Sequence, residues 1–424
     1  MTPVDPPAAA PLAGITVIAL EQAVSAPMCT RVLADFGARV IKIENPVGGD
    51  FARHYDDVVL GQAAHFVWVN RGKESVALDL KTDAGLDILH RLLGGADVLV
   101  SNLAPGATAR LGLSPDELAA RYPSLVAVEI DGFGRDGPLS HKRAYDLLVQ
   151  AEAGVCAVTG TAGQPAKPGP PVADATTGLY AALSIMMCLY RRDAGAAAGG
   201  PVPIGHLVRS EGATIGISLF DTMAELMGYH LTYARHAGVD QEPLGMSSPA
   251  VAPYGAYPTA DGHTVVLGTT NDREWQRLAT TVLQRPDLAA DTRFRTNTGR
   301  TSHRAELDAA ITAWCTRHDL ADIQRIADEA GIGNARYNRP SEVIAHPQLT
   351  QRDRWRDIET PAGPIPSLLP PAVIADYEAP MGPVPALGAD TEHILGEIGC
   401  TASEIEQMRH VAVIGGPVRT EVAT

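Results

Sequence analysis

The sequence has no excess of positive charge and few cysteines. Its 424 residues carry 34 Lys and Arg against 49 Asp and Glu, for a formal net charge of −15. Proteins that bind nucleic acid use clustered cations to neutralise phosphates, so this balance argues against a nucleic-acid partner. The five cysteines are odd in number and form no CxxC pair. They indicate reduced thiols of the cytoplasm rather than a disulfide scaffold or a zinc site.

Segments that target or cross membranes are also lacking. The stretch MTPVDPPAAAPLAG has neither the basic region nor the apolar region of a signal peptide. The apolar run LYAALSIMMCLY (179–190) is shorter than the roughly 20 residues that span a bilayer. These absences favour a cytoplasmic protein without a membrane partner.

The common cofactor and metal motifs are missing. No GxGxxG follows the first expected strand, where the sequence reads GITVIALEQAVSAP, which removes the main support for an NAD enzyme. GxxxxGK[ST], HExxH and GxSxG are absent as well. The 13 histidines are scattered without the spacing of metal ligands. We therefore expect no metal and no permanently bound cofactor.

What the sequence does contain is an alternation of short apolar strands and helices, beginning near residue 15. This pattern is typical of βαβ units and predicts an α/β fold around a mostly parallel sheet. Ligands of such sheets bind beyond the carboxyl ends of the strands. The expected strand ends lie near Glu21, Asn45, Asn102 and Asp131, and the strands are expected at 15–20, 39–44, 75–80, 96–102 and 124–131.

The character of the chain changes along its length. Residues 1–11 are rich in Pro and Ala and are expected to be flexible. After Gly238 two strands around an Ala-Asp-Gly turn precede several helices, which predicts a smaller α+β domain at 240–340. Residues 341–390 are Pro-rich and expected to be extended, and a helical pair is expected at the end of the chain.

One carboxylate, Asp174, draws attention within PPVADATTGLYAAL (170–183). It follows a Pro- and Gly-rich run and precedes an apolar helix that is expected to begin near Thr176. An aspartate in this place is often the N-cap of the helix. It can equally be a group that does chemistry, kept ionised by the helix N-terminus. The local pattern leaves both interpretations open.

Several stretches occur together in a family-specific order. They include PLAGITVIALEQAVSAPMCTRVLADFGARVIKIENPVGGDFAR, VNRGKESVALDLKTDAG, ADVLVSNLAPGATARLGL, AYDLLVQAEAGV and VADATTGLYAAL. From about residue 11 to 410 the chain resembles the class III CoA-transferases of the CaiB/BaiF type, which include formyl-CoA transferase and the carnitine CoA-transferases. The resemblance implies an interlocked homodimer, with each chain threaded through a ring of the other. It also implies a Rossmann-like large domain built from 12–235 plus 345–424.

The resemblance gives Asp174 the role of nucleophile. In the family this carboxylate attacks the acyl-CoA thioester, forms an acyl–aspartyl anhydride and releases CoA thiolate. The thiolate then forms an aspartyl-CoA thioester, which the acceptor acid resolves. A carboxylate nucleophile keeps the acyl group activated, whereas attack by water would destroy the thioester. The implied substrates are an acyl-CoA thioester and a small carboxylic acid.

Further site residues follow from the same resemblance. The implied CoA contacts are Lys73, Asn102, Leu103, Arg110 and Arg143, with Lys142 nearby as another basic candidate. The implied lining of the active site is Gln22, Val24, Ser25, Tyr145, Asp146 and Gln150. Formyl-CoA transferase carries a glutamine at the position of Val24, so this chain departs from it there.

Two other interpretations must be distinguished from the transferase. The α-methylacyl-CoA racemases share the fold and need a His and an Asp on either side of the substrate's Cα. Their histidine corresponds to Tyr145, and tyrosine is a poor base at neutral pH, which favours the transferase. A CoA-binding protein without activity is a third interpretation, and the intact Asp174 argues against it.

The nature of the acids is suggested by three stretches, LEQAVSAP, HFVWVNRGKES and GMSSPAVAPYGAYPTADG. They resemble the branch that acts on C4–C5 dicarboxylates, such as the mesaconyl-CoA and succinyl-CoA transferases. The free carboxylate of such a substrate needs a cation, for which Arg53, His54 and Arg71 are candidates. The run RRDAGAAAGGPVPIGHLVRS is longer than the equivalent turn of relatives, and an inserted surface loop is expected at 193–210.

Overall fold

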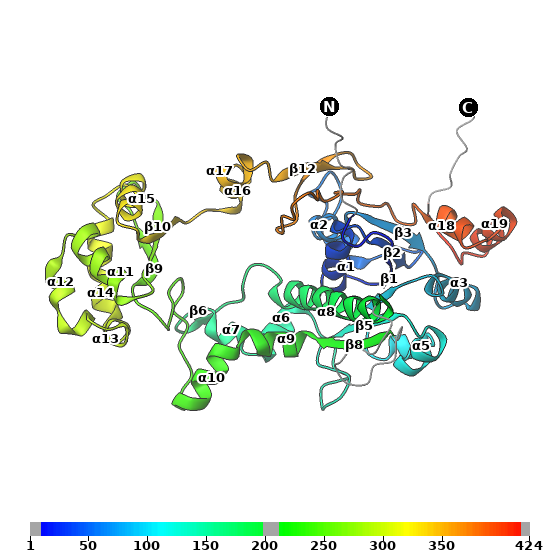
Figure 1. Ribbon diagram of the computed structural model, residues 1–424, viewed down its shortest axis with the longest axis horizontal. Helices are drawn as coiled ribbons and strands as arrows, with labels where there is room; N and C mark the ends of the chain where they lie inside the picture. The colour runs from blue at the N-terminus through cyan, green and yellow to red at the C-terminus, as the bar shows by residue number, and fades with distance from the viewer. Residues whose placement is uncertain (1–9, 198–211, 417–424) are drawn as a thin grey trace. The chain divides into compact units, whose positions relative to one another are not determined.

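The computed structural model describes residues 10–197 and 212–416 (Figure 1). The expected flexible segment 1–11 lies mostly outside these ranges, as do residues 198–210 of the expected loop 193–210, whose first residues, 193–197, belong to helix α8 (Val172–Ala197). The described chain divides into two compact units. Unit 1 holds the residues up to Ala153, Gly169–Met227 and the residues from Arg354 on, and unit 2 holds Gly154–Pro168 and Gly228–Asp353. The stretch Gly154–Pro168 thus clusters with unit 2, although the expected large domain included it.

Unit 1 is built on a parallel sheet of six strands in the order β3-β2-β1-β4-β5-β8 (Figure 1). The predicted α/β fold with a parallel sheet is thereby confirmed. From β1 the chain adds β2 and β3 on one side and then β4, β5 and β8 on the other, as in the doubly wound Rossmann arrangement. The strands are β1 (Thr16–Leu20), β2 (Arg39–Glu44), β3 (Lys73–Ala77), β4 (Val98–Ser101), β5 (Val126–Asp131) and β8 (Ala213–Ser218).

The central strands are apolar runs because both faces of the sheet are covered. Residues 17–20 of β1 are all buried, and β1 pairs in register with β2 (Thr16↔Arg39) and with β4 (Val17↔Val98). Strand β3 begins two residues before its expected start, at Lys73. The ammonium group of Lys73 is buried against Glu21, so a polar residue opens a strand that the hydrophobic pattern placed later.

Helices flank this sheet and carry the groups that follow its strands. The first helix begins at Ser25, and α8 begins at Val172 instead of near Thr176. The helical elements of unit 1 are α1 (Ser25–Asp35), η1 (Phe51–His54), α2 (Ala64–Asn70), α3 (Asp83–Leu93), α4 (Ala107–Arg110), α5 (Pro115–Arg121), α6 (Asp146–Glu152), α8 (Val172–Ala197), α9 (Leu219–Leu226), α18 (Thr391–Glu397) and α19 (Ala402–His410).

The C-terminal segment covers the edge strand β3. The N–H of Ser75 donates to Asp390 Oδ2 at 2.8 Å, and the N–H of Ala77 donates to Thr391 Oγ1 at 3.0 Å. Covering an edge strand in this way removes a surface on which other chains could pair. The expected terminal helical pair is confirmed as α18 and α19. The stretch expected to be extended contains a hairpin of β12 (Trp355–Ile358) and β13 (Ile365–Leu368).

Unit 2 has its own core around Trp275, which is fully buried. The predicted hairpin around Ala260-Asp261-Gly262 is confirmed, and a third strand, β11, joins it without having been predicted. The strands are β6 (Gly160–Thr161), β7 (Gln164–Pro165), β9 (Tyr254–Pro258), β10 (Thr264–Gly268) and β11 (Gly333–Arg336). The helical elements are α7 (Val155–Val158), α10 (Gly228–Ala237), α11 (Asp272–Arg277), the π-helical η2 (Leu278–Val282), α12 (Pro286–Ala290), η3 (Thr292–Phe294), α13 (Asn297–Ser302), α14 (Arg304–Cys315), α15 (Leu320–Glu329), α16 (Pro340–Ile344) and α17 (Pro347–Thr350).

Helix α8 is longer than the apolar run within it. Its segment Val172–Asp193 has 22 residues and is apolar enough to cross a membrane by length and composition alone, which the run 179–190 was not. In the structure α8 packs against α1, β5 and β8. Core helices of soluble proteins pass the same length and composition test, so the expectation of no membrane partner stays a prediction.

The contact between α1 and α8 depends on Gly178. A Cβ atom at this position would lie 2.4 Å from the carbonyl oxygen of Ser25 and 2.9 Å from Cβ of Met28. The first contact is to backbone, which cannot swing aside. Gly178 therefore lets the two helices approach more closely than any other residue would allow.

Gly178→Ala is expected to lower the free energy of unfolding by about 1–3 kcal/mol, because the added methyl group overpacks this contact. Gly396→Ala is the matched control, since α18 leaves open space around that position. It should be neutral or stabilise by up to about 1 kcal/mol through helix propensity. Urea unfolding of both variants measures the difference, and equal midpoints for the wild type and Gly178→Ala would show that the helices can separate freely.

Candidate active site

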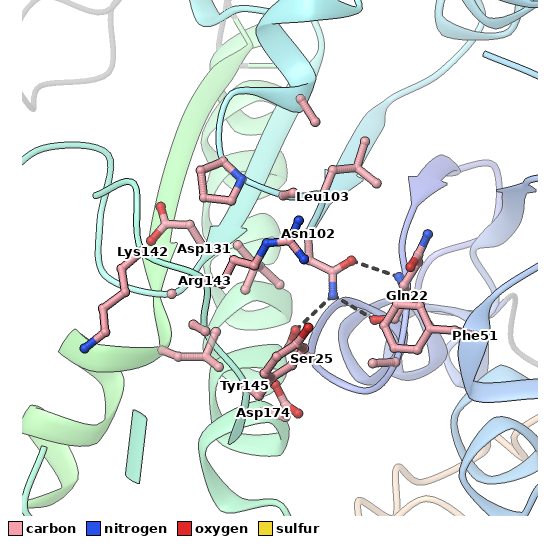
Figure 2. Close-up of a pocket in the computed structure, with 18 residues that line it drawn as sticks. Gln22, Ser25, Phe51, Asn102, Leu103, Asp131, Lys142, Arg143, Tyr145 and Asp174 are labelled. Carbon is pink, nitrogen blue, oxygen red and sulfur yellow. Dashed lines mark hydrogen bonds between the residues drawn. The ribbon is translucent and has the colours of Figure 1, made fainter. Parts of the chain in front are cut away.

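A cavity of about 440 Å³ opens in unit 1 beside the carboxyl ends of β1, β4 and β5 (Figure 2). The strand order reverses between β1 and β4, and such a reversal is where doubly wound sheets bind their ligands. A smaller cavity of about 140 Å³ lies at the ends of β1 and β2 and includes Asn45. The larger cavity is lined by Gln22, Ala23, Ser25, Phe51, Asn102, Leu103, Ala104, Pro105, Ala107, Ile130, Asp131, Gly132, Lys142, Arg143, Ala144, Tyr145, Asp174 and Leu219.

Asn102 fixes one wall of this cavity. Its Oδ1 accepts the N–H of Gln22 at 2.9 Å, and its Nδ2 donates to the carbonyl oxygen of Gln22 at 2.8 Å and to Ser25 Oγ at 3.1 Å (Figure 2). Asn102, the residue after β4, thus holds the loop after β1 through the backbone N–H and the carbonyl oxygen of Gln22. The predicted site residues Gln22, Ser25, Asn102 and Leu103 all line the cavity.

Asp174 lies in the same cavity, on the first turn of α8. Because the helix begins at Val172, Asp174 is its third residue, and the N-cap interpretation is wrong. The next turn of the same face carries Gly178, which packs on Ser25. Asp174 is therefore held close to the loop after β1, and Figure 2 draws it beside Ser25 and Tyr145 at one end of the cavity.

The N-terminus of α8 is capped from another helix. Oδ1 of Asp146 accepts the N–H of Ala173 at 2.9 Å and the N–H of Asp174 at 3.4 Å. Oδ2 of Asp146 accepts a hydrogen bond from Gln150 Nε2 at 2.6 Å. Asp146 thus accepts amides of the first turn of α8, where backbone N–H groups have no partner within the helix.

This arrangement sets the ionisation of Asp174. Burial and the nearby charge of Asp146 raise the pKa of Asp174 to about 7. We expected the helix N-terminus to keep this carboxylate ionised, and the structure shows the opposite balance. Desolvation disfavours the charged form, and a like charge adds to it. A pKa near neutrality in a cavity is typical of a group that reacts.

Two of the expected CoA cations border the cavity or lie near it. Arg143 lines it, and no ion pair joins Arg143 to another residue in the described ranges. Lys142 lines it too and pairs with Glu152 at 2.7 Å on the surface. Arg110 is exposed on α4, which begins with the lining residue Ala107. These side chains can reach a phosphate without breaking a buried contact.

Lys73 cannot play the part that the resemblance gave it. Its side chain is buried, and its Nζ donates to Glu21 Oε1 at 2.6 Å, to Asn70 Oδ1 at 3.0 Å and to the carbonyl oxygen of Pro27 at 3.1 Å. All donors of the ammonium group are in use. Lys73 is therefore held in a buried ion pair and is not among the residues that line the cavity.

Three of the expected lining residues, Val24, Asp146 and Gln150, are not among the residues that line the cavity. Val24 is only 4% exposed. Gln150 is fully buried and reaches the site only through Asp146. Sequence order placed Val24 and Gln150 near the site, but their side chains point into the packing of α1 and α6.

The expected cations for a second carboxylate are already engaged. Arg53 holds Glu44 with two hydrogen bonds of 2.8 and 2.7 Å, and Arg71 holds Asp35 with two of 2.8 Å. His54 is exposed and contacts the carbonyl oxygen of Gly48. A substrate carboxylate at either arginine would compete with these buried acids, of which Asp35 has a second cation, Arg31, at 3.7 Å.

Several lining residues were not predicted as part of the site. Phe51, the first residue of η1, is an exposed aromatic in a chain with only 6 Phe. Asp131 had been marked only as a strand end, and burial raises the pKa of its carboxyl group. Its Oδ1 accepts the N–H of Gly134 at 2.5 Å. The ring of Tyr55 lies 5.8 Å from that of Phe51 in a tilted arrangement, and burial, Asp50 and Asp174 raise the pKa of Tyr55.

The racemase interpretation finds little support in this geometry. The position of the racemase histidine is Tyr145, which lines the cavity and precedes the first residue of α6. No histidine is among the described residues that line the cavity. What the cavity offers is the carboxyl groups of Asp174 and Asp131, the hydroxyl groups of Ser25 and Tyr145, and the cations Lys142 and Arg143.

Comparison with known proteins agrees with this chemistry. The family model of CoA-transferase family III matches residues 12–391. The chain is 32% identical over 375 residues to the succinate–glutarate CoA-transferase of Agrobacterium fabrum, covering 86% of this chain and 90% of that protein. It is 31% identical to the succinyl-CoA–D-citramalate CoA-transferase of Chloroflexus aurantiacus, covering 83% and 84%.

A solved structure shares the fold. The crystal structure of a CaiB/BaiF family protein from Brucella suis superposes with a TM-score of 0.76 at 30% identity, covering 92% of this chain and 99% of that one. The chain therefore belongs to CoA-transferase family III, and it is an enzyme of that family.

The shifted pKa of Asp174 has a consequence for stability. The folded-state pKa of about 7 lies above the ordinary value of 3.8 that applies to the unfolded chain. Between these values the folded state holds a proton that the unfolded state has lost. This contribution to stability is complete at acid pH and is lost as the pH rises toward 7.

Asp174→Asn removes that loss. The free energy of unfolding of Asp174→Asn minus that of the wild type should therefore rise by about 1–3 kcal/mol from pH 5 to pH 8. Urea unfolding at both pH values measures this gain, with the exposed Asp57→Asn as the control for a general charge effect. A constant difference between Asp174→Asn and the wild type at both pH values would contradict the raised pKa.

Proposed function

We propose that this enzyme moves CoA from an acyl-CoA thioester to a small carboxylic acid, of the C4–C5 dicarboxylic class, through a covalent intermediate on Asp174. The observation that carries the proposal is the place of Asp174. It lies in the cavity at the reversal of strand order, on a fixed helix turn, with a pKa raised to about 7 by burial and by Asp146. A carboxylate that is partly desolvated and close to neutrality is suited to attack a thioester.

The first half of the reaction transfers the acyl group to the protein. The ionised carboxylate of Asp174 attacks the carbonyl carbon of the thioester, the carbon–sulfur bond breaks, and CoA leaves as a thiolate. The product on the protein is a mixed anhydride. The thiolate then attacks the carbonyl carbon of Asp174, the donor acid leaves as a carboxylate, and CoA is held as an aspartyl thioester.

The second half repeats these steps in reverse with the acceptor. The acceptor carboxylate attacks the aspartyl thioester, CoA thiolate leaves, and a new anhydride forms. The thiolate attacks the acyl carbon of the acceptor, and Asp174 is freed as a carboxylate. No proton and no water enter the balance, so the site must exclude water from both anhydrides.

Nearby groups support these steps. Asp146 fixes the first turn of α8 and so the direction of Asp174. The hydroxyl groups of Ser25 and Tyr145 line the same end of the cavity and are placed to donate to the oxyanions that form on the reacting carbonyl groups. Gln150 acts through Asp146 by holding its second oxygen.

The CoA portion is assigned to the mouth of the cavity. Arg143, Lys142 and Arg110 supply the charge for phosphates, and Arg can bind them through two parallel hydrogen bonds. Asn102 and Leu103 border the path toward Asp174. The net charge of −15 makes this local basic group the attractive feature for a polyanionic substrate.

The choice of dicarboxylic acids is supported by the relatives. The two proteins named above are called succinate–glutarate and succinyl-CoA–D-citramalate CoA-transferases, and both names contain C4–C5 dicarboxylic acids. The three stretches that resemble the dicarboxylate branch point the same way. We further propose action in the cytoplasm without a metal or a bound cofactor, in line with five free thiols.

We also propose the interlocked homodimer. Helix α8 exposes a row of large apolar side chains although it carries the reacting residue, and α6 exposes two more beside it. These side chains are Leu147, Leu148, Leu179, Tyr180, Leu183, Met187 and Tyr190. An exposed apolar face of this extent on a metabolic enzyme marks an interface, and the family resemblance implies a second copy as its cover.

Incubation with succinyl-CoA is expected to leave an acyl or CoA adduct on the peptide that contains Asp174, detected by mass spectrometry after proteolysis. Asp174→Asn should form no adduct and should lose at least about 10³-fold in kcat, because the nucleophile is gone. Its affinity for CoA and its fold should stay near those of the wild type.

The same incubation should be repeated with mesaconyl-CoA, glutaryl-CoA and oxalyl-CoA as donors, each with unlabelled succinate as acceptor. Full activity of Asp174→Asn would remove the nucleophile assignment. Deuterium from the solvent at Cα of a branched acyl-CoA, with no adduct, would establish the racemase alternative instead.

The dimer makes a separate prediction. Interlocked chains must unfold before they part, so two differently labelled preparations should not exchange subunits over days at 25 °C. Mixed-species mass spectrometry follows the exchange, and brief denaturation and refolding of the mixture is the positive control. Exchange within minutes would contradict interlocking while leaving an ordinary dimer possible.

A further inference from the structure

Five charged side chains are buried behind the wall of the active-site cavity, and a sixth, Arg53, is partly buried beside them. Glu21, Glu44 and Asp50 supply three negative charges, and Lys42, Arg53 and Lys73 supply three positive ones. Together they form a neutral set, which we call the buried charge cluster. None of these residues touches the substrate in the proposed mechanism, yet the cost of removing these ions from water is high.

The cluster is fully connected. Lys42 Nζ lies 2.8 Å from Asp50 Oδ2 and 3.3 Å from Glu21 Oε1. Lys73 Nζ lies 2.6 Å from Glu21 Oε1, and Arg53 holds Glu44. Glu44 Oε2 in turn accepts the N–H of Asp50 at 2.9 Å. Each carboxylate therefore has a fixed direction.

Asp50 connects the buried charge cluster to the cavity wall through its other carboxylate oxygen. Its Oδ1 accepts the N–H of Ala23 at 3.1 Å and the N–H of Ala52 at 2.9 Å. Ala23 lines the cavity, and so does Phe51, the residue between Asp50 and Ala52. One carboxylate oxygen thus joins two separate walls of the cavity, the loop after β1 and the turn η1.

The wall at Ala23 needs such a hold. Ala23 has a φ of +62°, in the left-handed region that residues with a Cβ rarely adopt. Strained backbone of this kind persists only where the surroundings determine it, and it gathers at active sites. Asn102 fixes the preceding peptide at Gln22, and Asp50 fixes the N–H of Ala23 itself.

We propose that Asp50 is a positioning residue for CoA transfer: oriented by Lys42, its carboxylate holds the strained turn at Ala23 and the turn at Phe51 against the cavity of Asp174. The inference rests on the proposed function. Without the carboxylate of Asp50 as hydrogen-bond acceptor, the backbone at Ala23 relaxes toward negative φ. The wall that faces the reacting carbonyl group then moves.

Two double variants separate the loss of the hydrogen-bond acceptor at residue 50 from the loss of its charge. Lys42→Met with Asp50→Asn removes one cation and one anion but keeps a side-chain oxygen for the N–H of Ala23. Lys42→Met with Asp50→Leu removes the same two charges with a side chain of the same shape and no acceptor. Both leave the pairs Glu21–Lys73 and Glu44–Arg53 in place, so the cluster stays neutral.

The asparagine variant is expected to keep kcat for succinyl-CoA within about 3-fold of the wild type, whereas the leucine variant should lose about 10- to 100-fold in kcat, because a displacement near 1 Å can cost 10²-fold. KM for succinyl-CoA should differ little between the two variants, since the CoA cations are untouched. Hydrogen exchange should show faster exchange at the amide of Ala23 in the leucine variant alone. Thermal unfolding confirms that both variants are folded.

Equal kcat of the two folded variants would overturn the inference, whether both are active or both are inactive. Should the leucine variant not fold, Asp50→Ala on the same Lys42→Met background replaces it, since alanine also accepts no hydrogen bond and adds no bulk. Failure of the proposed function is a distinct result: the wild type would then transfer no CoA and form no adduct on Asp174.

Discussion

The hydrogen bonds from the first amides of α8 to Asp146 are the interaction on which the rest of the site depends. They join α6 to the start of the helix that carries Asp174, and they leave the two carboxyl groups close together. The same contact therefore fixes the first turn that carries Asp174, and the charge of Asp146 adds to burial in raising the pKa of Asp174. An aspartate that capped its own helix could not do both, because its oxygens would be used by its own backbone.

The walls around Asp174 are held by polar contacts instead of apolar packing. Asn102 grips the loop after β1, and the buried charge cluster lies behind that loop and η1. Apolar residues of the same volume would often give equal or greater stability than such buried ions. Hydrogen bonds, however, fix direction as well as distance, and a reacting site needs direction. The chain thus trades stability for a defined wall.

The sequence was sufficient for the overall organisation of unit 1, whereas the role of Asp174 comes from the family resemblance and is a proposal. Apolar runs that alternate with helical periods predicted the parallel sheet, and strand ends at Asn102 and Asp131 pointed to the cavity. It could not show that Lys73 is buried, because a lysine after a glycine reads as a surface residue until its partner Glu21 is seen beside it. Two carboxylates 28 residues apart in sequence, Asp146 and Asp174, likewise gave no sign of sharing a helix end.

The raised pKa of Asp174, about 7, ties the ionisation of this carboxyl group to the acidity of its surroundings. Under the proposed function only the ionised fraction can start a turnover. That fraction is about half at pH 7 and about a tenth at pH 6, since each pH unit changes the ratio tenfold. Acidification of the cell would thus slow metabolic flux through this step directly, with no regulator bound, and recovery of pH would restore it at once.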